Sequence, residues 1–138
     1  MIRYLLDTCV ISDFVKGETG TINRLKQTDP AEVAVSTVTV MELHYGLVLN
    51  PERAQKIAPA IASILSIVRV LSFEAADAEY AAQIRVALKT TGKPIGAYDV
   101  LIAATALRHS LKVVTANQRE FERVSSLEIE NWRQADSL

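Results

Sequence analysis

The stretch Ile2-Arg3-Tyr4-Leu5-Leu6-Asp7-Thr8 decides the fold, because a short apolar run ending in polar residues is typical of a buried strand that leads into a loop. The same pattern recurs along the chain. It predicts a second strand at 33–36, a third at 70–73, a fourth at 112–115 and a short fifth at 127–130. We therefore expect a central sheet of four to five strands.

The segments between these strands carry helical spacing and stop signals. They predict helices at 10–16, 19–27, 37–49, 51–68, 74–90 and 97–109. Val38, Met41, Tyr45 and Val48 share one helix face, which either packs in the core or forms a groove for a partner helix. Because strands and helices alternate throughout, the sequence predicts an α/β fold with a parallel sheet covered on both faces.

Composition limits the possible classes of protein. The chain has 138 residues, 49% hydrophobic and 22% charged, which predicts a single globular domain over 1–138. Its 15 basic and 16 acidic residues give a net charge of −1, so a general polyanion binder is disfavoured, although a local patch could still contact a nucleic acid. A single cysteine excludes an internal disulfide framework. With no signal peptide and no membrane span, we expect a soluble, cytoplasmic protein.

Three acids stand in apolar surroundings: Asp7 after the first strand, Glu42 inside an apolar helix, and Asp99 before a long apolar run. The other acids, Asp13 and Asp77 among them, are interpreted as solvated faces, caps or tails. A structural role is open for each of the three: Asp7 as a helix cap, Asp99 at a helix N-terminus, and Glu42 paired with a cation such as Arg85.

Taken together, the three acids favour a metal site. Ligands of parallel sheets bind beyond the carboxyl ends of the strands, where Asp7, Glu42, Asp99 and the end of the fourth strand can converge. Three carboxylates repel one another unless a divalent ion lies between them. An all-oxygen ligand set suits Mg²⁺ or Mn²⁺. The two histidines have no metal-binding spacing and are interpreted as incidental.

Four segments resemble the PIN-domain family, and specifically its VapC-type ribonuclease toxins of type II toxin–antitoxin systems. They are Leu6-Asp7-Thr8, residues 36–43, residues 96–104, and Val114-Thr115-Ala116-Asn117 with Glu120-Phe121. The resemblance implies a three-layer α/β/α domain. It implies Asp7, Glu42 and Asp99 as the metal ligands and places Thr8 and Thr115 near the pocket.

The sequence departs from the family pattern at two positions. Asn117 stands where the family often has a fourth acid, with Glu120 three residues on, and Cys9 replaces a common asparagine. Asn117 is retained as a catalytic candidate, and a non-catalytic PIN-like module that binds RNA or protein is the alternative. Cys9 also excludes a haloacid-dehalogenase-type phosphatase, which needs a second Asp at that position. The sequence has no glycine-rich phosphate loop, which disfavours a nucleotide hydrolase.

The resemblance also implies a function. It implies a Mg²⁺- or Mn²⁺-dependent endoribonuclease that cuts a structured RNA such as a tRNA and thereby inhibits translation. It also implies a homodimer and a VapB-type antitoxin that neutralises the enzyme. Because an acidic pocket repels RNA, basic residues should hold the backbone at its rim. Taken singly, each basic candidate is better explained as solvated surface, and only as a group do they suggest RNA contact. They are Arg85, Lys89, Lys93, Arg119 and Arg123.

Overall fold

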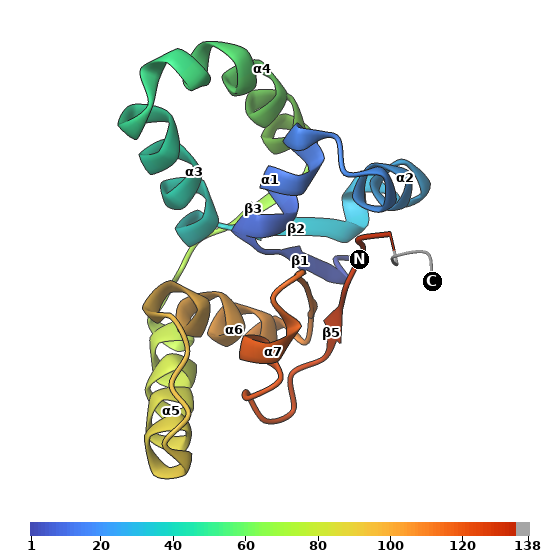
Figure 1. Cartoon of the computed structure of the whole chain (residues 1–138). Coiled ribbons are helices and arrows are strands. Elements are labelled where there is room, and N and C mark those ends of the chain that lie inside the picture. Colours follow the sequence, from blue (N-terminus) through green and yellow to red (C-terminus); the bar gives the residue numbers. More distant parts are fainter. Residues whose placement is uncertain (135–138) are drawn as a thin grey trace.

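The computed structural model describes residues 1–134 and contains five parallel strands in the order β3-β2-β1-β4-β5 (Figure 1). The strands are β1 (Tyr4–Leu6), β2 (Val33–Ser36), β3 (Arg69–Leu71), β4 (Lys112–Val114) and β5 (Ile129–Glu130). The helices are α1 (Thr8–Lys16), α2 (Thr19–Gln27), α3 (Thr37–Leu49), α4 (Pro51–Ile67), α5 (Ala75–Thr91), α6 (Ala97–His109) and α7 (Gln118–Phe121), with a short 3₁₀ turn, η1, at Pro30–Glu32. The predicted α/β fold with a five-stranded parallel sheet is confirmed.

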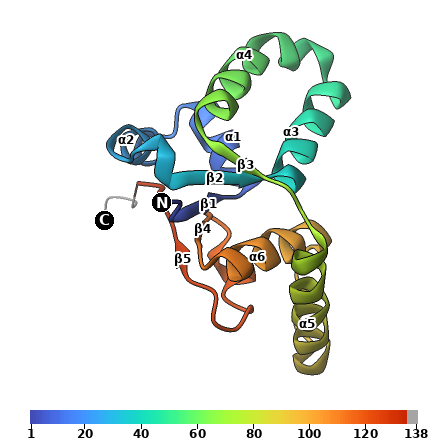
Figure 2. The same cartoon turned by 180° about the vertical axis from the view of Figure 1, so that it is seen from behind.

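Helices cover both faces of the sheet, as Figure 2 shows from behind. Side chains of successive strand residues point to opposite faces. Tyr4 and Leu6 therefore pack with α1, α3 and α4, whereas Leu5 packs with α5, α6 and α7. All three residues are at most 4% exposed, which places β1 in the centre of the core.

The register brings the carboxyl ends of the three central strands together. Leu6 lies opposite Val35 of β2 and Val114 of β4. The residues that follow these strands, among them Asp7 and Thr115, consequently meet at one edge of the sheet. This edge is where the sequence predicted a site.

The predicted helix at 37–49 is confirmed. Of the two alternatives for its apolar face, packing in the core is not what the structure shows for most of that face. Of the predicted face only Val38 is buried, whereas Met41, Tyr45 and Val48 are 41%, 64% and 80% exposed; the other buried residues of the helix are Thr39 and Leu43. Helix α3 runs away from the sheet toward α4, so only its first turns meet the core (Figure 1). Because apolar residues lie on all sides of this helix, their spacing does not select the buried face.

A buried ion pair joins α5 to α6. Asp77 is fully buried and accepts a hydrogen bond from Arg108 Nε at 2.5 Å, and it also accepts one from the Glu74 backbone N–H at 2.7 Å. Of the roles predicted for Asp77, capping is confirmed and a solvated position is wrong. Its cationic partner lies 31 residues away, so local spacing does not reveal the ion pair.

Among residues 1–134, none of the helices has the length and apolar character needed to cross a bilayer.

Candidate functional site

Asp7 lies where β1 ends and caps α1. Its Oδ1 accepts a hydrogen bond from the Val10 backbone N–H at 3.0 Å, and its Oδ2 accepts one from the Thr115 hydroxyl at 2.5 Å. The residue is 2% exposed. Burial, opposed by these two bonds and reinforced by nearby Asp13 and Glu42, raises the pKa of Asp7 to about 6. The predicted capping role of Asp7 is confirmed. Because the carboxyl is buried at the sheet edge, its ionisation costs free energy.

Thr115 connects Asp7 to the turn after β4. Its hydroxyl oxygen accepts the Asn117 backbone N–H at 2.9 Å while its hydrogen points to Asp7. The Asn117 side-chain amide in turn donates to Glu120 Oε2 at 2.7 Å. The residues that the sequence placed near the fourth acidic position thus form one chain of hydrogen bonds with the first acid.

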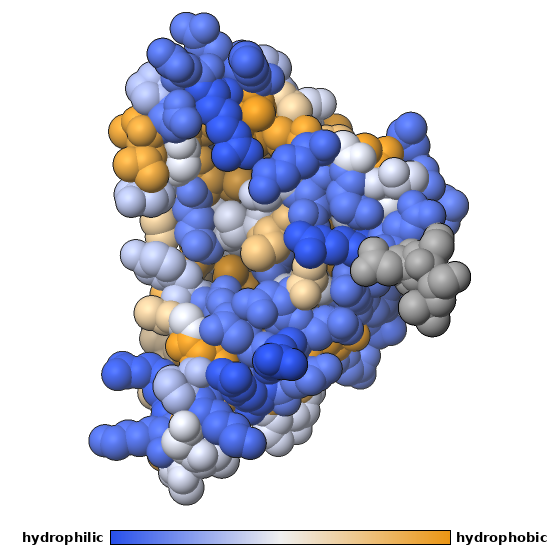
Figure 3. Space-filling model, viewed as in Figure 1, coloured by the Kyte–Doolittle hydropathy of each residue, from blue (hydrophilic) through white to orange (hydrophobic). Residues whose placement is uncertain are grey.

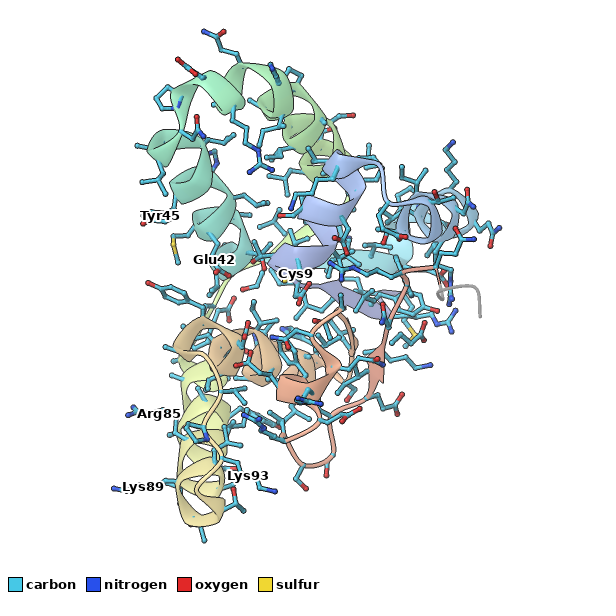
Figure 4. All side chains as sticks on the ribbon, viewed as in Figure 1. Cys9, Glu42, Tyr45, Arg85, Lys89 and Lys93 are labelled. Carbon is cyan, nitrogen blue, oxygen red and sulfur yellow. The ribbon has the colours of Figure 1, made fainter. Side chains whose placement is uncertain are left out.

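Glu42 reaches the same edge from α3. Its Oε1 accepts a hydrogen bond from the Thr8 hydroxyl at 2.7 Å. This is the only hydrogen bond or ion pair found for Glu42 among the described residues, so the alternative pairing with Arg85 is not observed. Figure 4 shows Glu42 and Cys9 near each other between α3 and α1, whereas Arg85 projects from α5.

Asp99 stands in the first turn of α6 and interacts with Glu120. Burial, the hydrogen bond to Glu120, and then the charges of Glu120, Asp7 and Glu42 raise the pKa of Asp99 to about 7. The pKa of Glu120 is lowered, first by its hydrogen bond with Asp99. The two pKa values move in opposite directions, so within this pair Asp99 binds a proton more tightly than Glu120 does.

Asp7, Glu42 and Asp99 line one open cleft of about 380 Å³. Its lining residues are Asp7, Thr8, Cys9, Ser12, Asp13, Lys16, Glu42, Asp99 and Arg133. The structure thus brings all three predicted acids into one cleft. The pKa of Cys9 is raised to about 11, first by the partial covering of its sulfur and then by Asp7 and Asp99, so it is not an activated nucleophile.

Asp13 was wrongly interpreted as a solvated acid. It is 6% exposed and accepts two hydrogen bonds from Arg133, from Nε at 2.7 Å and from Nη2 at 2.9 Å. Arg133 lies 120 residues further along the chain, and the sequence offered no local signal for the pair. The other cation in the cleft, Lys16, ends α1 and was likewise missed.

None of the basic residues that the sequence proposed for the rim is among the residues that line this cleft. Arg85 and Lys89 line a separate hollow between α5 and α6, and Figure 4 shows them with Lys93 far from Cys9. Arg123 donates to the Pro94 carbonyl at 2.8 Å, and exposed Arg119 is not among the cleft residues. The chain order and helical spacing of these residues did not indicate which way their helices run.

The donor set of the cleft fits a hard divalent cation. Within residues 1–134, no group of three or more His, Cys, Asp or Glu side chains is already closed around a metal position. The carboxyls nevertheless lie close enough for their charges to interact: Glu42 raises the pKa of Asp7 and of Asp99, and Asp7 also raises that of Asp99. Carboxylate and hydroxyl oxygens with this excess of negative charge are ligands that Mg²⁺ or Mn²⁺ prefers.

The chain is thus a parallel α/β domain with an acidic cleft at the carboxyl edge of its sheet. The PIN domain model matches residues 4–127, and the chain belongs to the PIN-domain family. A tRNA(fMet)-specific endonuclease VapC from Shigella flexneri is 34% identical over 132 residues, which cover 96% of this chain and 99% of the relative. Ribonuclease VapC2 from Haemophilus influenzae is 35% identical with the same coverage.

Solved structures agree with this assignment. The crystal structure of DNA-bound VapBC from Salmonella typhimurium contains a chain that matches with a TM-score of 0.87 and 33% identity. The match covers 96% of this chain and 99% of that one. The resemblance to VapC-type PIN domains is confirmed.

Proposed function

We propose that this protein is a Mg²⁺- or Mn²⁺-dependent endoribonuclease toxin of a toxin–antitoxin pair. The observation that carries the proposal is the convergence of Asp7, Glu42 and Asp99 in one cleft of a chain whose relatives are named VapC ribonucleases. The acids come from three separate elements, and structural stability alone does not require them to meet. Ionised Asp7 and Asp99 cost free energy there unless a cation neutralises them, as their raised pKa values indicate.

The side chains of the cleft have distinct tasks. Asp7, Glu42 and Asp99 would hold the divalent cation. Thr115 fixes the Asp7 carboxyl through its hydroxyl, and Thr8 orients Glu42 in the same way. When bound, the cation supplies positive charge and Lewis acidity toward a phosphodiester and an attacking water.

Glu120 serves in place of the acid that the family often has at the Asn117 position. Asn117 holds Glu120 by a 2.7 Å hydrogen bond, and Glu120 shares a proton with Asp99. Glu120 would thereby supply the additional negative charge beside Asp99 that the family often has at position 117. Asn117 then acts by positioning Glu120, and a fourth acid at 117 itself is not required.

The substrate we propose is a structured RNA, and within that class a tRNA. The support is the printed name of the Shigella flexneri relative, a tRNA(fMet)-specific endonuclease, together with high coverage of both chains. Attack of water on phosphorus, with the bond to the 3′ oxygen breaking and that oxygen leaving, would give a 3′-hydroxyl and a 5′-phosphate. Loss of a tRNA would halt translation, which is the action of a growth-inhibiting toxin.

A VapB-type antitoxin is the partner we propose. Support comes from the match to a VapBC complex and from a groove of about 280 Å³ between α1, α3 and α4. Leu43, Leu47 and Ile57 give the groove an apolar wall, and Glu42 connects it to the acidic cleft. Figure 3 shows apolar surface along α3 and in the space between α3 and α4. A helix inserted there would reach the cleft with its next residues.

The homodimer is a further part of the proposal. The exposed apolar residues Tyr45, Val48 and Leu49 at the end of α3 offer a surface that a second copy would cover. Mass determination of the purified toxin over a range of concentrations tests this point. A mass that stays that of one chain at all concentrations would contradict it.

The decisive experiment is an RNA cleavage assay on antitoxin-free protein. Unfractionated tRNA is incubated with Mg²⁺ or Mn²⁺, with a chelator control, and the new ends are mapped. Asp99→Asn removes a proposed ligand, and Glu79→Gln, an exposed acid of α5, is the matched control. We expect discrete, metal-dependent cuts that Asp99→Asn abolishes and Glu79→Gln leaves intact.

Two results would change the assignment. Cleavage that persists in chelator or in a folded Asp99→Asn protein would contradict the metal-site assignment. RNA binding without cleavage by the folded wild type would favour the alternative, a non-catalytic PIN-like module.

A further inference from the structure

Arg133 contributes a positive charge to the lining of the acidic cleft, although it lies 120 residues after Asp13 in the sequence. Its guanidinium uses one edge, Nε and Nη2, to hold both oxygens of Asp13 at 2.7 and 2.9 Å. The Arg133 side chain is 50% exposed, whereas that of Asp13 is 8% exposed. The buried carboxylate thus anchors one edge of the guanidinium, and Nη1 takes no part in these two bonds.

The backbone around Arg133 is held as firmly as its side chain. Trp132 is 4% exposed and packs edge-on against Tyr4, with ring centroids 5.3 Å apart. Gly20 of α2 lies so close to residues 132–134 that a Cβ there would come within 2.8 Å of the Arg133 carbonyl carbon. The Gln134 N–H also donates to Glu18 at 3.2 Å. Arg133 therefore reaches the cleft from a fixed backbone and without the entropy of a free tail.

An arginine in this position suits the phosphate of a nucleic-acid strand. A guanidinium forms paired, charge-assisted hydrogen bonds with phosphate oxygens, and it loses less freedom when one edge is already fixed. The other cleft residues are mainly acids and hydroxyls, and Lys16 is the other cation of the lining. The basic residues on α5, which the sequence suggested for this task, lie away from the cleft.

We propose that Arg133, oriented by Asp13, contacts a backbone phosphate of the RNA in the cleft and thereby positions the strand beside Asp7 and Asp99. This inference rests on the proposed function, since it names how that site would take its substrate. Asp13 acts through Arg133, so it is a positioning residue. The contact contributes to substrate binding, and no proton or bond change is assigned to either residue.

The test must separate this contact from the loss of a structural ion pair. Removing Arg133 alone would leave the buried Asp13 carboxylate unpaired and could unfold the protein. The double variant Asp13→Asn with Arg133→Gln removes both charges, keeps the net charge and retains hydrogen-bonding groups. The matched control is Arg3→Gln with Glu32→Gln, an ion pair at the amino end of β1, away from the cleft.

Steady-state cleavage of unfractionated tRNA is measured for both double variants and for Arg133→Lys. For Asp13→Asn/Arg133→Gln we expect KM to rise about tenfold with kcat nearly unchanged. The slope of log KM against log salt should fall by about 0.7, the value for one lost phosphate contact on a single strand. Arg133→Lys, which keeps the charge without the fork, should give an intermediate KM. The control pair should match the wild type.

The outcomes are distinct from those for the nuclease itself. A wild type that neither binds nor cuts RNA refutes the proposed function and this inference with it. A wild type that cuts, beside a folded cleft variant with unchanged KM and salt slope, refutes only the role of Arg133. Faster cleavage by the cleft variant would also overturn the inference, because it would make Arg133 an internal inhibitor.

Discussion

Replacing Asp7 by Asn should change the pH dependence of stability in a way that can be calculated. The pKa of Asp7 rises from 3.8 to about 6 on folding, chiefly because the carboxyl is buried. The folded state therefore binds this proton more tightly than the unfolded chain does. As a result, the metal-free protein loses stability as the pH rises from about 4 to about 6, and the loss is complete above the folded pKa.

The size of the effect follows from the shift. A difference of about two pKa units corresponds to about 3 kcal/mol at pH 7.5, of which about 1.6 kcal/mol already applies at pH 5. Asp7→Asn has no charge to bury, so its stability relative to the wild type should increase by about 1.4 kcal/mol between those two pH values. The substituted amide still accepts from the Val10 N–H. A disturbed hydrogen bond to Thr115 subtracts about 1 kcal/mol at both pH values.

Urea unfolding in chelator at pH 5 and pH 7.5 measures this difference. For a slope of about 1.5 kcal/mol per molar urea, the midpoint of the variant relative to the wild type should rise by about 1 M between the two conditions. Asp29→Asn, which removes an exposed carboxylate, controls for general charge effects. Parallel stability curves for wild type and Asp7→Asn across this range would refute the reasoning.

Three further changes test other parts of the site. Mg²⁺ at about a hundred times its Kd should stabilise the wild type by about 2.7 kcal/mol, and thermal melts should show almost no gain for Asp99→Asn. Thr115→Val removes the hydroxyl between Asp7 and the Asn117 N–H; it should cost about 1–3 kcal/mol in urea unfolding, and an unchanged midpoint would contradict the hydrogen-bond chain. Gly20→Ala forces residues 132–134 to move and should cost about 1–3 kcal/mol while raising KM for RNA; a normal melting curve would show that the contact is not tight.

The sheet and its helices could be predicted because their signals are local. Short apolar runs such as Tyr4–Leu6 and the nearly all-apolar helix after Asp99 define buried strands and a buried helix by composition alone. Their alternation determines a parallel topology, and that topology brings Asp7 and Thr115 to the same edge. The predicted acids met for this reason.

The burial of α3 and the position of the basic residues could not be predicted in the same way. Tyr45 and Val48 are apolar at helical spacing, but the helix has already left the sheet where they occur. Arg85 and Lys89 precede Asp99 closely in sequence, yet α5 carries them to another face. In both cases the sequence spacing fixes a position on a helix but not the direction in which the helix runs.

The pairing of Asp13 with Arg133 shows what kind of information the sequence lacks. A buried carboxylate needs a partner, but which of the 15 basic residues supplies it depends on how the chain closes. Here residues 132–134 pass over Gly20, and Arg133 thereby lies in the cleft. Because Asp13 neutralises much of that charge, the cleft keeps an excess of carboxylate, and a polyanionic substrate must meet it together with a divalent cation. If the proposed function holds, the charge balance of the cleft would make RNA binding depend on metal binding, which the net charge of −1 for the whole chain does not indicate.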